Sequence, residues 1–286
     1  MNWIRKYPRE VVIGALILSN IFVWVAVYQR QSGDLLKVYF LDVGQGDAIF
    51  IDSPTHKQVL IDGGKNRQVL SKIAQALPFG DKSIDVVIGT HPDADHIGGL
   101  PEVIARYDVD LFFEPGVESE NNIDDELKRR IEDKNIPSLV ARRGMVLNLG
   151  DGVRLTILFP TQDVSNWETN RASIVAKLEY GDISFLLTGD SPIGIEDALM
   201  KMNSRILDID VLKLGHHGSR TSTSLKFSQV TTPEYAIISA GRDNSYGHPH
   251  QEVLNNLASV GAKILSTFEN GTIKFETDGT TLQLNK

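Results

Sequence analysis

The chain has 286 residues, of which 41% are apolar and 23% charged, an ordinary balance for a globular protein. This length suits one large domain or two small ones, and the composition excludes a disordered, collagen-like or fully membrane-embedded chain. Because the chain has no cysteine, a disulfide framework, a cysteine nucleophile and a cysteine-ligated zinc site are all excluded.

The net charge of −8 is unevenly distributed along the chain. Residues 1–30 carry Arg5, Lys6, Arg9 and Arg30 against Glu10, which gives +3 and leaves −11 for the remainder. A strongly acidic body argues against a broad basic surface that binds long duplex DNA. It does not exclude a small phosphodiester site that contains a metal ion.

Residues 11–28 form an uncharged apolar segment of 18 residues, about 27 Å long as a helix, which just reaches across a hydrocarbon core. The excess of positive charge before it predicts an N-in, C-out orientation. We therefore predict a signal anchor over residues 1–30, a polar linker at 31–35, and a single-pass cell-membrane protein whose body lies outside the cytoplasm. The alternatives are cleavage as a signal peptide, which would leave a secreted body, and a buried core helix.

The body, residues 36–286, alternates short apolar strands with amphipathic helices. Strands are predicted at residues 36–41, 48–51, 58–61, 84–89, 110–113, 155–159, 173–179, 184–188, 211–214 and 236–239. Helices are predicted at residues 68–77, 98–106, 124–134, 195–202 and 249–260, and a terminal β-hairpin at 264–268 and 271–276. This order predicts an α/β fold in which two mixed sheets pack together and are covered by helices.

The most informative motif is HPDADH at residues 91–96, directly after a predicted strand. Its two imidazoles and two carboxylates would be costly to leave unpaired together, and in a tight loop they can converge on one point. Nitrogen and oxygen donors of this kind suit Zn²⁺ or Mn²⁺. The alternative is an exposed polar turn with an aspartate cap.

Three further polar segments follow apolar strands or precede a helix. Asp190 ends LTGD, His216 and His217 lie in GHHGSR, and His248 lies in YGHPH. Each has a structural alternative as a cap or a surface turn. Because such residues come repeatedly at strand ends, we expect a rigid sheet to present them as one site.

Together these segments resemble the metallo-β-lactamase fold superfamily and, within it, the metallo-β-lactamase domain of the ComEC family of bacterial DNA-uptake proteins. The segments FLDVGQGDA at 40–48 and LIDGG at 60–64 resemble its first motifs, and HPDADH resembles its H-x-D-x-D-H variant of the commoner H-x-H-x-D-H. The resemblance runs from about residue 36 to 277. It implies an αββα sandwich over residues 36–286, the body that follows the single transmembrane helix predicted above.

The resemblance also implies a site for one or two divalent metal ions, Zn²⁺ or Mn²⁺. Asp190 would bridge two ions, and one of two adjacent histidines would complete the second site, a choice that the sequence leaves open. The implied ligands are His91 and Asp93 for the first ion, Asp95 and His96 for the second, then Asp190, and His216 or His217. Three aspartates among them make Mn²⁺ a competitor of Zn²⁺.

Four other residues would support these ligands. Asp42, Asp47 and Asp62 are expected to orient ligands from behind. The usual third-motif histidine of the family is missing, and Asn170 stands near its place. Asn170 would contact the metal or only water, so one of the two metal sites is expected to be weak or empty.

A bound metal lowers the pKa of its water from 15.7 to about 7, and two ions about 3.5–4 Å apart stabilise the attacking and leaving oxygens of a phosphodiester. Asp95 would orient or deprotonate the attacking water, and His248 would stabilise the phosphate or protonate the leaving group. Ser219, Arg220 and Asn244 are candidate phosphate contacts by neighbourhood alone, and each is equally well explained as a loop residue.

We therefore predict a membrane-anchored, extracytoplasmic metal-dependent hydrolase, a phosphodiesterase or nuclease whose substrate is single-stranded or short nucleic acid. One alternative is a hydrolase of a non-nucleotide ester, lactone or β-lactam, which the aspartate-rich site disfavours. Another is a catalytically weak binding module of a DNA-uptake assembly. With one membrane segment the chain is not expected to form a pore, so a separate DNA-uptake channel protein is a predicted partner.

Overall fold

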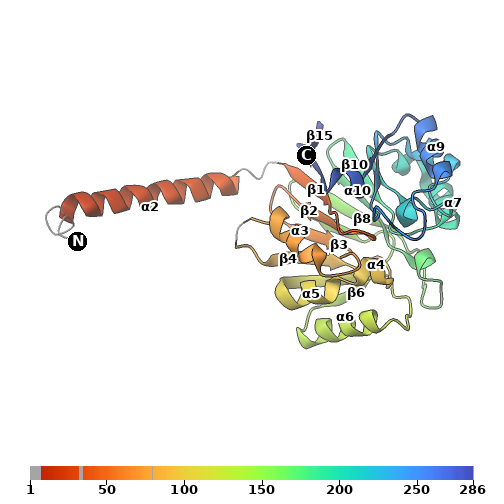
Figure 1. The fold of residues 1–286 in the computed structure, drawn as a ribbon, viewed down its shortest axis with the longest axis horizontal. Coiled ribbons are helices and arrows are strands. Elements are labelled where there is room, and N and C mark those ends of the chain that lie inside the picture. Colours follow the sequence, from red (N-terminus) through yellow and green to blue (C-terminus); the bar gives the residue numbers. More distant parts are fainter. Residues whose placement is uncertain (1–7, 32–34, 79, 286) are drawn as a thin grey trace.

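The computed structural model describes residues 8–31, 35–78 and 80–285. Two β-sheets pack face to face, helices cover their outer faces, and the long helix α2 (Pro8–Gln31) lies apart from these layers (Figure 1). The predicted αββα sandwich is therefore confirmed. Arg5 and Lys6 of the predicted anchor and residues 32–34 of the predicted linker lie outside the described residues.

The helix α2 contains the apolar segment predicted at residues 11–28. Its side chains are exposed at Leu18, Phe22 and Trp24, among others. Of the helices that the described residues form, none is long and apolar enough to cross a membrane. The membrane crossing stays a prediction.

The first sheet has eight strands in the order β15-β14-β1-β2-β3-β4-β5-β6. Their bounds are β1 Leu36–Phe40, β2 Ile49–Asp52, β3 Gln58–Ile61, β4 Ser83–Ile88, β5 Asp108–Glu114, β6 Ser138–Val140, β14 Ile273–Thr277 and β15 Leu282–Asn285. The strands β3 to β6 run parallel, and the others pair antiparallel.

The second sheet has seven strands in the order β13-β12-β11-β10-β9-β8-β7. Their bounds are β7 Val146–Asn148, β8 Arg154–Phe159, β9 Val175–Tyr180, β10 Ile183–Leu187, β11 Val211–Lys213, β12 Tyr235–Ile238 and β13 Lys263–Ser266. The strands β10 to β13 run parallel. Parallel strands end at the same edge of their sheet, so the residues after β3, β4, β10, β11 and β12 can meet there.

The apolar core has one layer between the sheets and one on each outer face. Between the sheets, the ring of Phe275 contacts those of Phe40 and Phe185 with centroids 6.1 and 6.0 Å apart. The first sheet is covered by α3 (Gln68–Ala76), α4 (Ala94–Ile97), α5 (Leu100–Arg106) and α6 (Asn122–Asp133); the second is covered by α7 (Ile193–Asn203), α8 (Leu225–Thr231) and α9 (Gln251–Ser259). Each buried Leu, Ile or Phe stabilises this arrangement by about 1.5–3 kcal/mol relative to its exposed state.

The predicted terminal hairpin is wrong. Its first segment is β13, which pairs with β12 in the second sheet, and its second segment is β14, which pairs with β1 in the first sheet. The short helix α10 (Thr267–Asn270) carries the chain from one sheet to the other, and the terminal hairpin is β14–β15. Two apolar segments around a turn resemble a hairpin locally, but pairing with distant strands decides their sheets. The strands β6 and β7 and the helix α8 were not predicted.

Candidate metal centre

The HPDADH motif leaves the end of β4, and its last residues form the single turn α4. The backbone amide of Asp47 donates a hydrogen bond to the carbonyl of Asp95 (3.2 Å), which brings the loop before β2 against this turn. Gly46 makes this approach possible, because a Cβ there would stand 1.8 Å from the carbonyl oxygen of Asp95 and its φ is +114°. The motif is thus fixed by the first sheet and by the loop at residues 42–47.

His96 is oriented from behind by Asp62. The Asp62 Oδ2 atom lies 2.7 Å from His96 Nδ1, and the same carboxylate accepts hydrogen bonds from the backbone amide (2.8 Å) and the hydroxyl (2.7 Å) of Thr90. With its Nδ1 proton donated to Asp62, the ring presents the Nε2 lone pair to the other side. The structure thus places Asp62 behind His96, and its role in orienting a metal ligand stays a prediction.

His217 has a second carboxylate, that of Asp47, behind its ring, in ion-pair contact instead of a hydrogen bond. Its Nδ1 lies 3.3 Å from Asp47 Oδ1, and the other oxygen of Asp47 lies 2.5 Å from Nζ of Lys213. Lys213 is fully buried and also donates to the carbonyl of Leu214 (2.8 Å). We did not predict Lys213 as a site residue. The signal in the sequence was a lysine inside the apolar segment VLKL, three residues before the histidine pair.

The two adjacent histidines both have a left-handed backbone conformation, but their rings differ in burial. His216 has φ +47° and His217 has φ +55°, a conformation that costs non-glycine residues about 1–3 kcal/mol each and that the surroundings must impose. The ring of His217 is buried, whereas that of His216 is 29% exposed and its Nε2 lies 3.8 Å from Asp190 Oδ2. The sequence left open which histidine joins His96, and the geometry selects His217.

Four side chains converge on one point, which we call the paired-histidine subsite (Asp95, His96, Asp190 and His217). The two Nε2 atoms of His96 and His217 lie 3.3 Å apart. Asp190 Oδ1 lies 3.2 Å from His96 Nε2, and Asp190 Oδ2 lies 3.5 Å from His217 Nε2. Asp95 Oδ2 lies 3.3 Å from His217 Nε2. Ligand atoms of His96, Asp190, His217 and Asp47 all lie within 4.8 Å of one another.

On its other side Asp190 borders a looser group, the His91 subsite (His91, Asp93 and Asp190). His91 Nε2 lies 3.8 Å from Asp93 Oδ2 and 3.9 Å from Asp190 Oδ2. Behind the ring, Nδ1 lies near hydroxyls instead of a carboxylate, 3.1 Å from Thr90 and 3.3 Å from Ser173. Asp190 therefore stands between two groups of nitrogen and oxygen donors.

The charges in the cluster favour a cation at the paired histidines. Burial alone lowers a histidine pKa, but the nearby carboxylates Asp190 and Asp62 raise the pKa of His96 well above its usual value. In the same way Asp190 and Asp47 raise the pKa of His217 to about 9 against its burial. His91 has no carboxylate behind it, and burial together with the charge of His96 lowers its pKa to about 4.

Several buried polar atoms of the cluster have no hydrogen-bond partner within the described residues. They include His91 Nε2 and Asp190 Oδ1. Such atoms are costly in a protein interior unless a ligand satisfies them. A divalent ion bound by imidazole nitrogens and carboxylate oxygens does so, and it also separates the two Nε2 lone pairs of His96 and His217. The residues present therefore fit Zn²⁺ or Mn²⁺.

Asn170 lies beside the His91 subsite along the chain. It begins the short helix η1 (Asn170–Ala172), next to Thr169, whose side chain hydrogen-bonds Asp93. Three residues later, Ser173 contacts His91 and accepts a hydrogen bond from the backbone amide of Asp190 (3.2 Å). The amide oxygen of Asn170 is buried without a hydrogen-bond partner within the described residues, and its contact to a metal or a water stays a prediction.

Asp42 lies apart from the cluster. Its carboxylate accepts a hydrogen bond from the amide of Gly44 (3.4 Å) and lies 4.0 Å from Nζ of Lys72. In the described part of the chain it makes no contact with a cluster side chain. The prediction that Asp42 orients a ligand is therefore not supported, and its contacts indicate that it turns the loop.

The three candidate phosphate contacts differ in their surroundings. Ser219 is buried, and its hydroxyl accepts a hydrogen bond from the hydroxyl of Thr221 (3.0 Å). Asn244 uses both ends of its amide within its own loop. Arg220 is exposed, and its backbone amide donates to His250 Nδ1 (3.2 Å). These contacts favour the loop interpretation for Ser219 and Asn244 and leave the guanidinium of Arg220 available to a phosphate.

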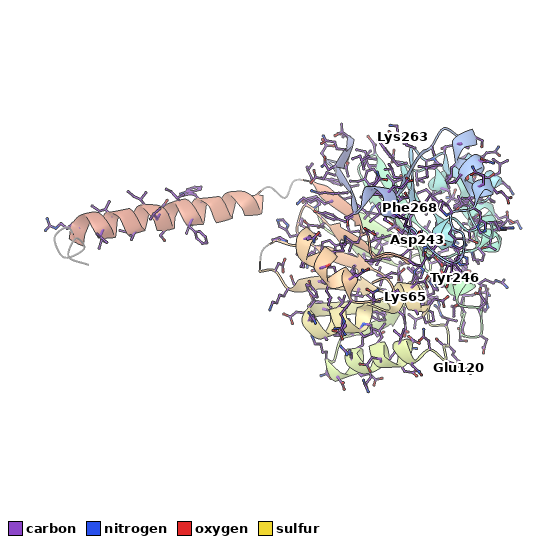
Figure 2. All side chains as sticks on the ribbon, viewed as in Figure 1. Lys65, Glu120, Asp243, Tyr246, Lys263 and Phe268 are labelled. Atoms are coloured by element: carbon purple, nitrogen blue, oxygen red, sulfur yellow. The ribbon has the colours of Figure 1, made fainter. Side chains whose placement is uncertain are left out.

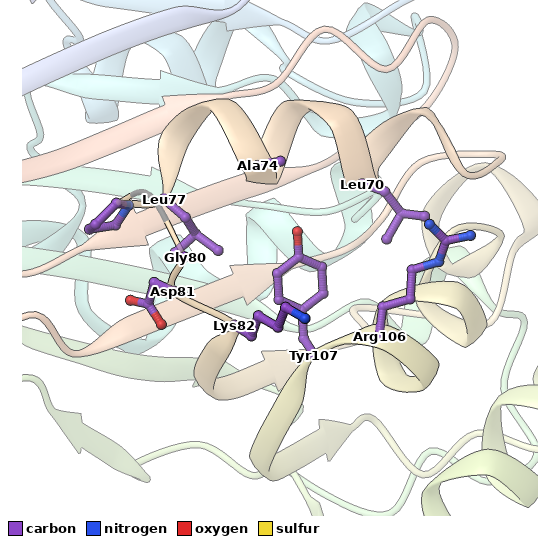
Figure 3. Close-up of a pocket in the computed structure, with 9 residues that line it drawn as sticks. Leu70, Ala74, Leu77, Gly80, Asp81, Lys82, Arg106 and Tyr107 are labelled. Carbon is purple, nitrogen blue, oxygen red and sulfur yellow. The ribbon is translucent and has the colours of Figure 1, made fainter. Parts of the chain in front are cut away.

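A separate pocket of about 750 Å³ lies between α3 and the end of α5 (Figure 3). Its lining includes Leu77, Arg106 and Tyr107, and none of its lining residues belongs to either subsite. The convergent polar groups are at the strand ends, so the metal cluster, and not this pocket, is the candidate active site.

Two stacked sheets with a buried His/Asp cluster along one edge define a class of metal-dependent hydrolases, and comparison with known proteins identifies the class. Residues 41–242 match the metallo-β-lactamase superfamily, and the chain belongs to that superfamily.

Curated relatives include competence-related proteins. The chain is 34% identical to "ComE operon protein 3" of Bacillus subtilis over 95% of this chain and 36% of that protein, and 28% identical to "Competence protein ComA" of Neisseria gonorrhoeae over 82% and 31%. The chain thus spans about a third of the length of these relatives. A solved structure, Igni18, a metallo hydrolase from the archaeon Ignicoccus hospitalis, has the same fold, with a TM-score of 0.55, 18% identity and coverage of 84% of this chain and 99% of that one.

Proposed function

We propose that this metal-dependent hydrolase is a phosphodiesterase that cleaves nucleic acid. One observation carries the proposal: Asp190 lies between two groups of donors, 3.2–3.5 Å from the paired histidines and 3.9 Å from His91. A carboxylate in this position can bridge two divalent ions, the arrangement that stabilises both oxygens of an in-line displacement at phosphorus. The competence relatives support nucleic acid as the source of the phosphodiester.

The cluster supplies oxygen donors in a proportion that suits this chemistry. Asp93, Asp95 and Asp190 all face it, and with no cysteine in the chain it has no thiolate donor. Carboxylate-rich sites favour hard ions such as Mn²⁺ beside Zn²⁺. When bound, such ions activate water and neutralise charge that develops on the phosphate.

Asp95 and His248 have different tasks in this proposal. Burial would raise the pKa of Asp95, but its contact with His217 and the charge of His96 keep that pKa well below the usual range. Oδ2 of Asp95 therefore binds a cation or orients a water by accepting its hydrogen bond. Burial and the neighbouring His216 lower the pKa of His248 to about 4, so its neutral ring donates a hydrogen bond to a phosphate oxygen.

Cleavage assays test the proposal directly. The full chain, solubilised and loaded with Mn²⁺ or Zn²⁺, is incubated with single-stranded DNA, double-stranded DNA and RNA, beside Asp190→Asn and the exposed control Asp182→Asn. We expect metal-dependent cleavage that Asp190→Asn abolishes and Asp182→Asn retains. A metal-loaded protein that cleaves none of these, nor a simple phosphodiester, would overturn the proposal and direct attention to esters, lactones and β-lactams or to binding without catalysis.

We also propose that α2 anchors the hydrolase in the cell membrane, with its body outside the cytoplasm. An isolated helix that exposes Leu16, Leu18, Phe22 and Trp24, each between 64% and 75%, needs an apolar environment to cover it. Its 24 residues are about 36 Å long as a helix, more than the thickness of a hydrocarbon core. The competence relatives support a role in DNA uptake, and a separate DNA-uptake channel protein is the partner that we propose at that surface.

The lack of cysteine makes the orientation simple to measure. A single Glu120→Cys variant in intact cells should react with a maleimide that does not cross membranes, because Glu120 is exposed on the body. A single Asn2→Cys variant should react only after lysis. The opposite pattern would contradict the orientation, and release of the chain by alkaline carbonate would contradict the anchor.

A further inference from the structure

An exposed aromatic side chain, Tyr246, lies beside the imidazole rings that border the metal centre. Tyr246 is 62% exposed, and in residues 35–78 and 80–285 it is the only aromatic residue that is exposed rather than buried or half-buried (Figure 2). Its ring lies on that of His248, with centroids 5.7 Å apart and planes inclined by 23°. One side of the tyrosine is therefore covered by an imidazole while most of the residue faces solvent.

This pair of rings lies next to the cluster. The ring of His248 is 5.4 Å from that of His216 and 6.5 Å from that of His217, centroid to centroid. Tyr246 is therefore separated from the paired-histidine subsite by a single imidazole. A group that stacks on Tyr246 would be held beside whatever binds at His217.

The loop that carries the two rings is fixed before any ligand arrives. The amide nitrogen of Asn244 donates to the carbonyls of Gly241 (2.8 Å) and His248 (2.7 Å), and its oxygen accepts from the amide of His248 (3.0 Å). Gly241 in turn donates to the side chain of Gln45 (3.1 Å), which lies in the loop before β2. A ring held in this way loses little conformational entropy when a ligand stacks on it.

The geometry points to a nucleobase subsite formed by Tyr246 and His248, next to the metal centre. This inference rests on the proposed nuclease function and deepens it. In a nucleotide one sugar joins the base to its phosphates, so a base stacked on Tyr246 leaves a neighbouring phosphate within reach of the cluster. The buried Nδ1 of His248 has no hydrogen-bond partner within the described residues, so this ring also has a polar atom to offer a nucleotide.

Stacking also resolves the conflict between the charge of the protein and its substrate. The chain beyond residue 30 carries −11, so long-range attraction for a polyanion is weak. Stacking on an aromatic ring is insensitive to that charge, and every base has a π-face. A base can stack there only when it is unpaired, so the subsite favours single-stranded nucleic acid.

A binding experiment with two variants tests the subsite. The metal-loaded full chain is titrated with a cleavage-resistant, phosphorothioate-linked single strand that contains 2-aminopurine, whose fluorescence falls when it stacks. We expect Tyr246→Ala to bind this strand about 5- to 100-fold more weakly and to lose the quenching. Tyr246→Phe keeps the ring and should retain both.

An abasic strand separates stacking from other effects of the mutation. It should bind the wild type and Tyr246→Ala equally, because it offers no base to stack on the ring. Equal binding and quenching of the 2-aminopurine strand by the wild type and Tyr246→Ala, in a protein that cleaves DNA, would overturn the subsite alone. A wild type that neither binds nor cleaves any strand would overturn the nuclease function and the subsite with it.

Discussion

The two subsites that share Asp190 differ in what stands behind their imidazoles. His96 and His217 have carboxylates at Nδ1, from Asp62 and Asp47, whereas His91 has only two hydroxyls. In the paired-histidine subsite the imidazole nitrogens and the carboxylate oxygens that face them are 3.2–3.5 Å apart, whereas in the His91 subsite they are 3.8–3.9 Å apart.

This difference indicates that the two subsites bind metal unequally. A carboxylate behind an imidazole fixes the ring and makes it a stronger donor, whereas a hydroxyl does so weakly. Asp93 also leaves the His91 subsite open, since its side chain is 37% exposed. We expect the first metal ion to bind at the paired histidines and the second, weaker one at His91.

Asp190 belongs to both subsites, so its replacement should have the largest effect on hydrolysis. Asp190→Asn keeps the volume but removes the charge that both subsites share, and we expect hydrolysis to fall by on the order of 10³-fold or more. Metal analysis after dialysis should show loss of both ions. Full metal content in Asp190→Asn would show that the subsites do not share it.

Removal of one histidine from each subsite should separate the two ions. We expect His217→Ala to lose the tight ion and His91→Ala to lose only the weak one, as measured by calorimetric titration with Mn²⁺ or Zn²⁺. Each variant is the control of the other. If His91→Ala abolishes the tight ion, our assignment of the stronger subsite is wrong.

Loss of the negative charge of Asp62 behind His96 should have an intermediate effect on metal affinity. Asp62→Asn leaves a partner of similar size at Nδ1 but removes its charge, and loss of such an orienting group typically lowers metal affinity about 10–100-fold. The tight binding constant in the same titration measures it. Asp52→Asn changes another buried carboxylate of the first sheet, away from the cluster, and should leave that constant unchanged.

The sequence predicted the candidate ligand residues of this site better than the residues and backbone that hold them in place. HPDADH, Asp190 and the histidine pair were visible because costly polar groups followed apolar strands. The choice of His217 over His216 depended on two consecutive left-handed residues, which no residue type there predicts. Lys213 was missed because a single lysine within an apolar strand resembles an exposed edge position until its burial is known.

The errors in the fold have a related cause. Asp42 and Asp47 lie in one loop, and only packing against Lys213 and His217 distinguishes the residue that supports the site. The segments that became β13 and β14 have the local pattern of a hairpin, but their partners, β12 and β1, are distant in sequence. Local pattern predicts the elements, whereas long-range pairing decides their neighbours.

Removal of a hydroxyl behind His91 should have the smallest effect on metal binding, and that effect should be confined to the His91 subsite. Ser173→Ala removes one of the two hydroxyls near Nδ1, but Thr90 remains 3.1 Å away to hold the ring. We expect the weak binding constant to fall by less than about 10-fold, below the usual range for loss of an orienting group, and the tight constant to stay unchanged. Ser191→Ala is a matched control, because this buried serine follows Asp190 but its hydroxyl has no hydrogen-bond partner within the described residues. The Ser173 hydroxyl also accepts a hydrogen bond from the backbone amide of Asp190. If Ser173→Ala lowered metal affinity more at the tight site than at the weak one, Ser173 would act through that amide, and the two subsites would be coupled through that strand end.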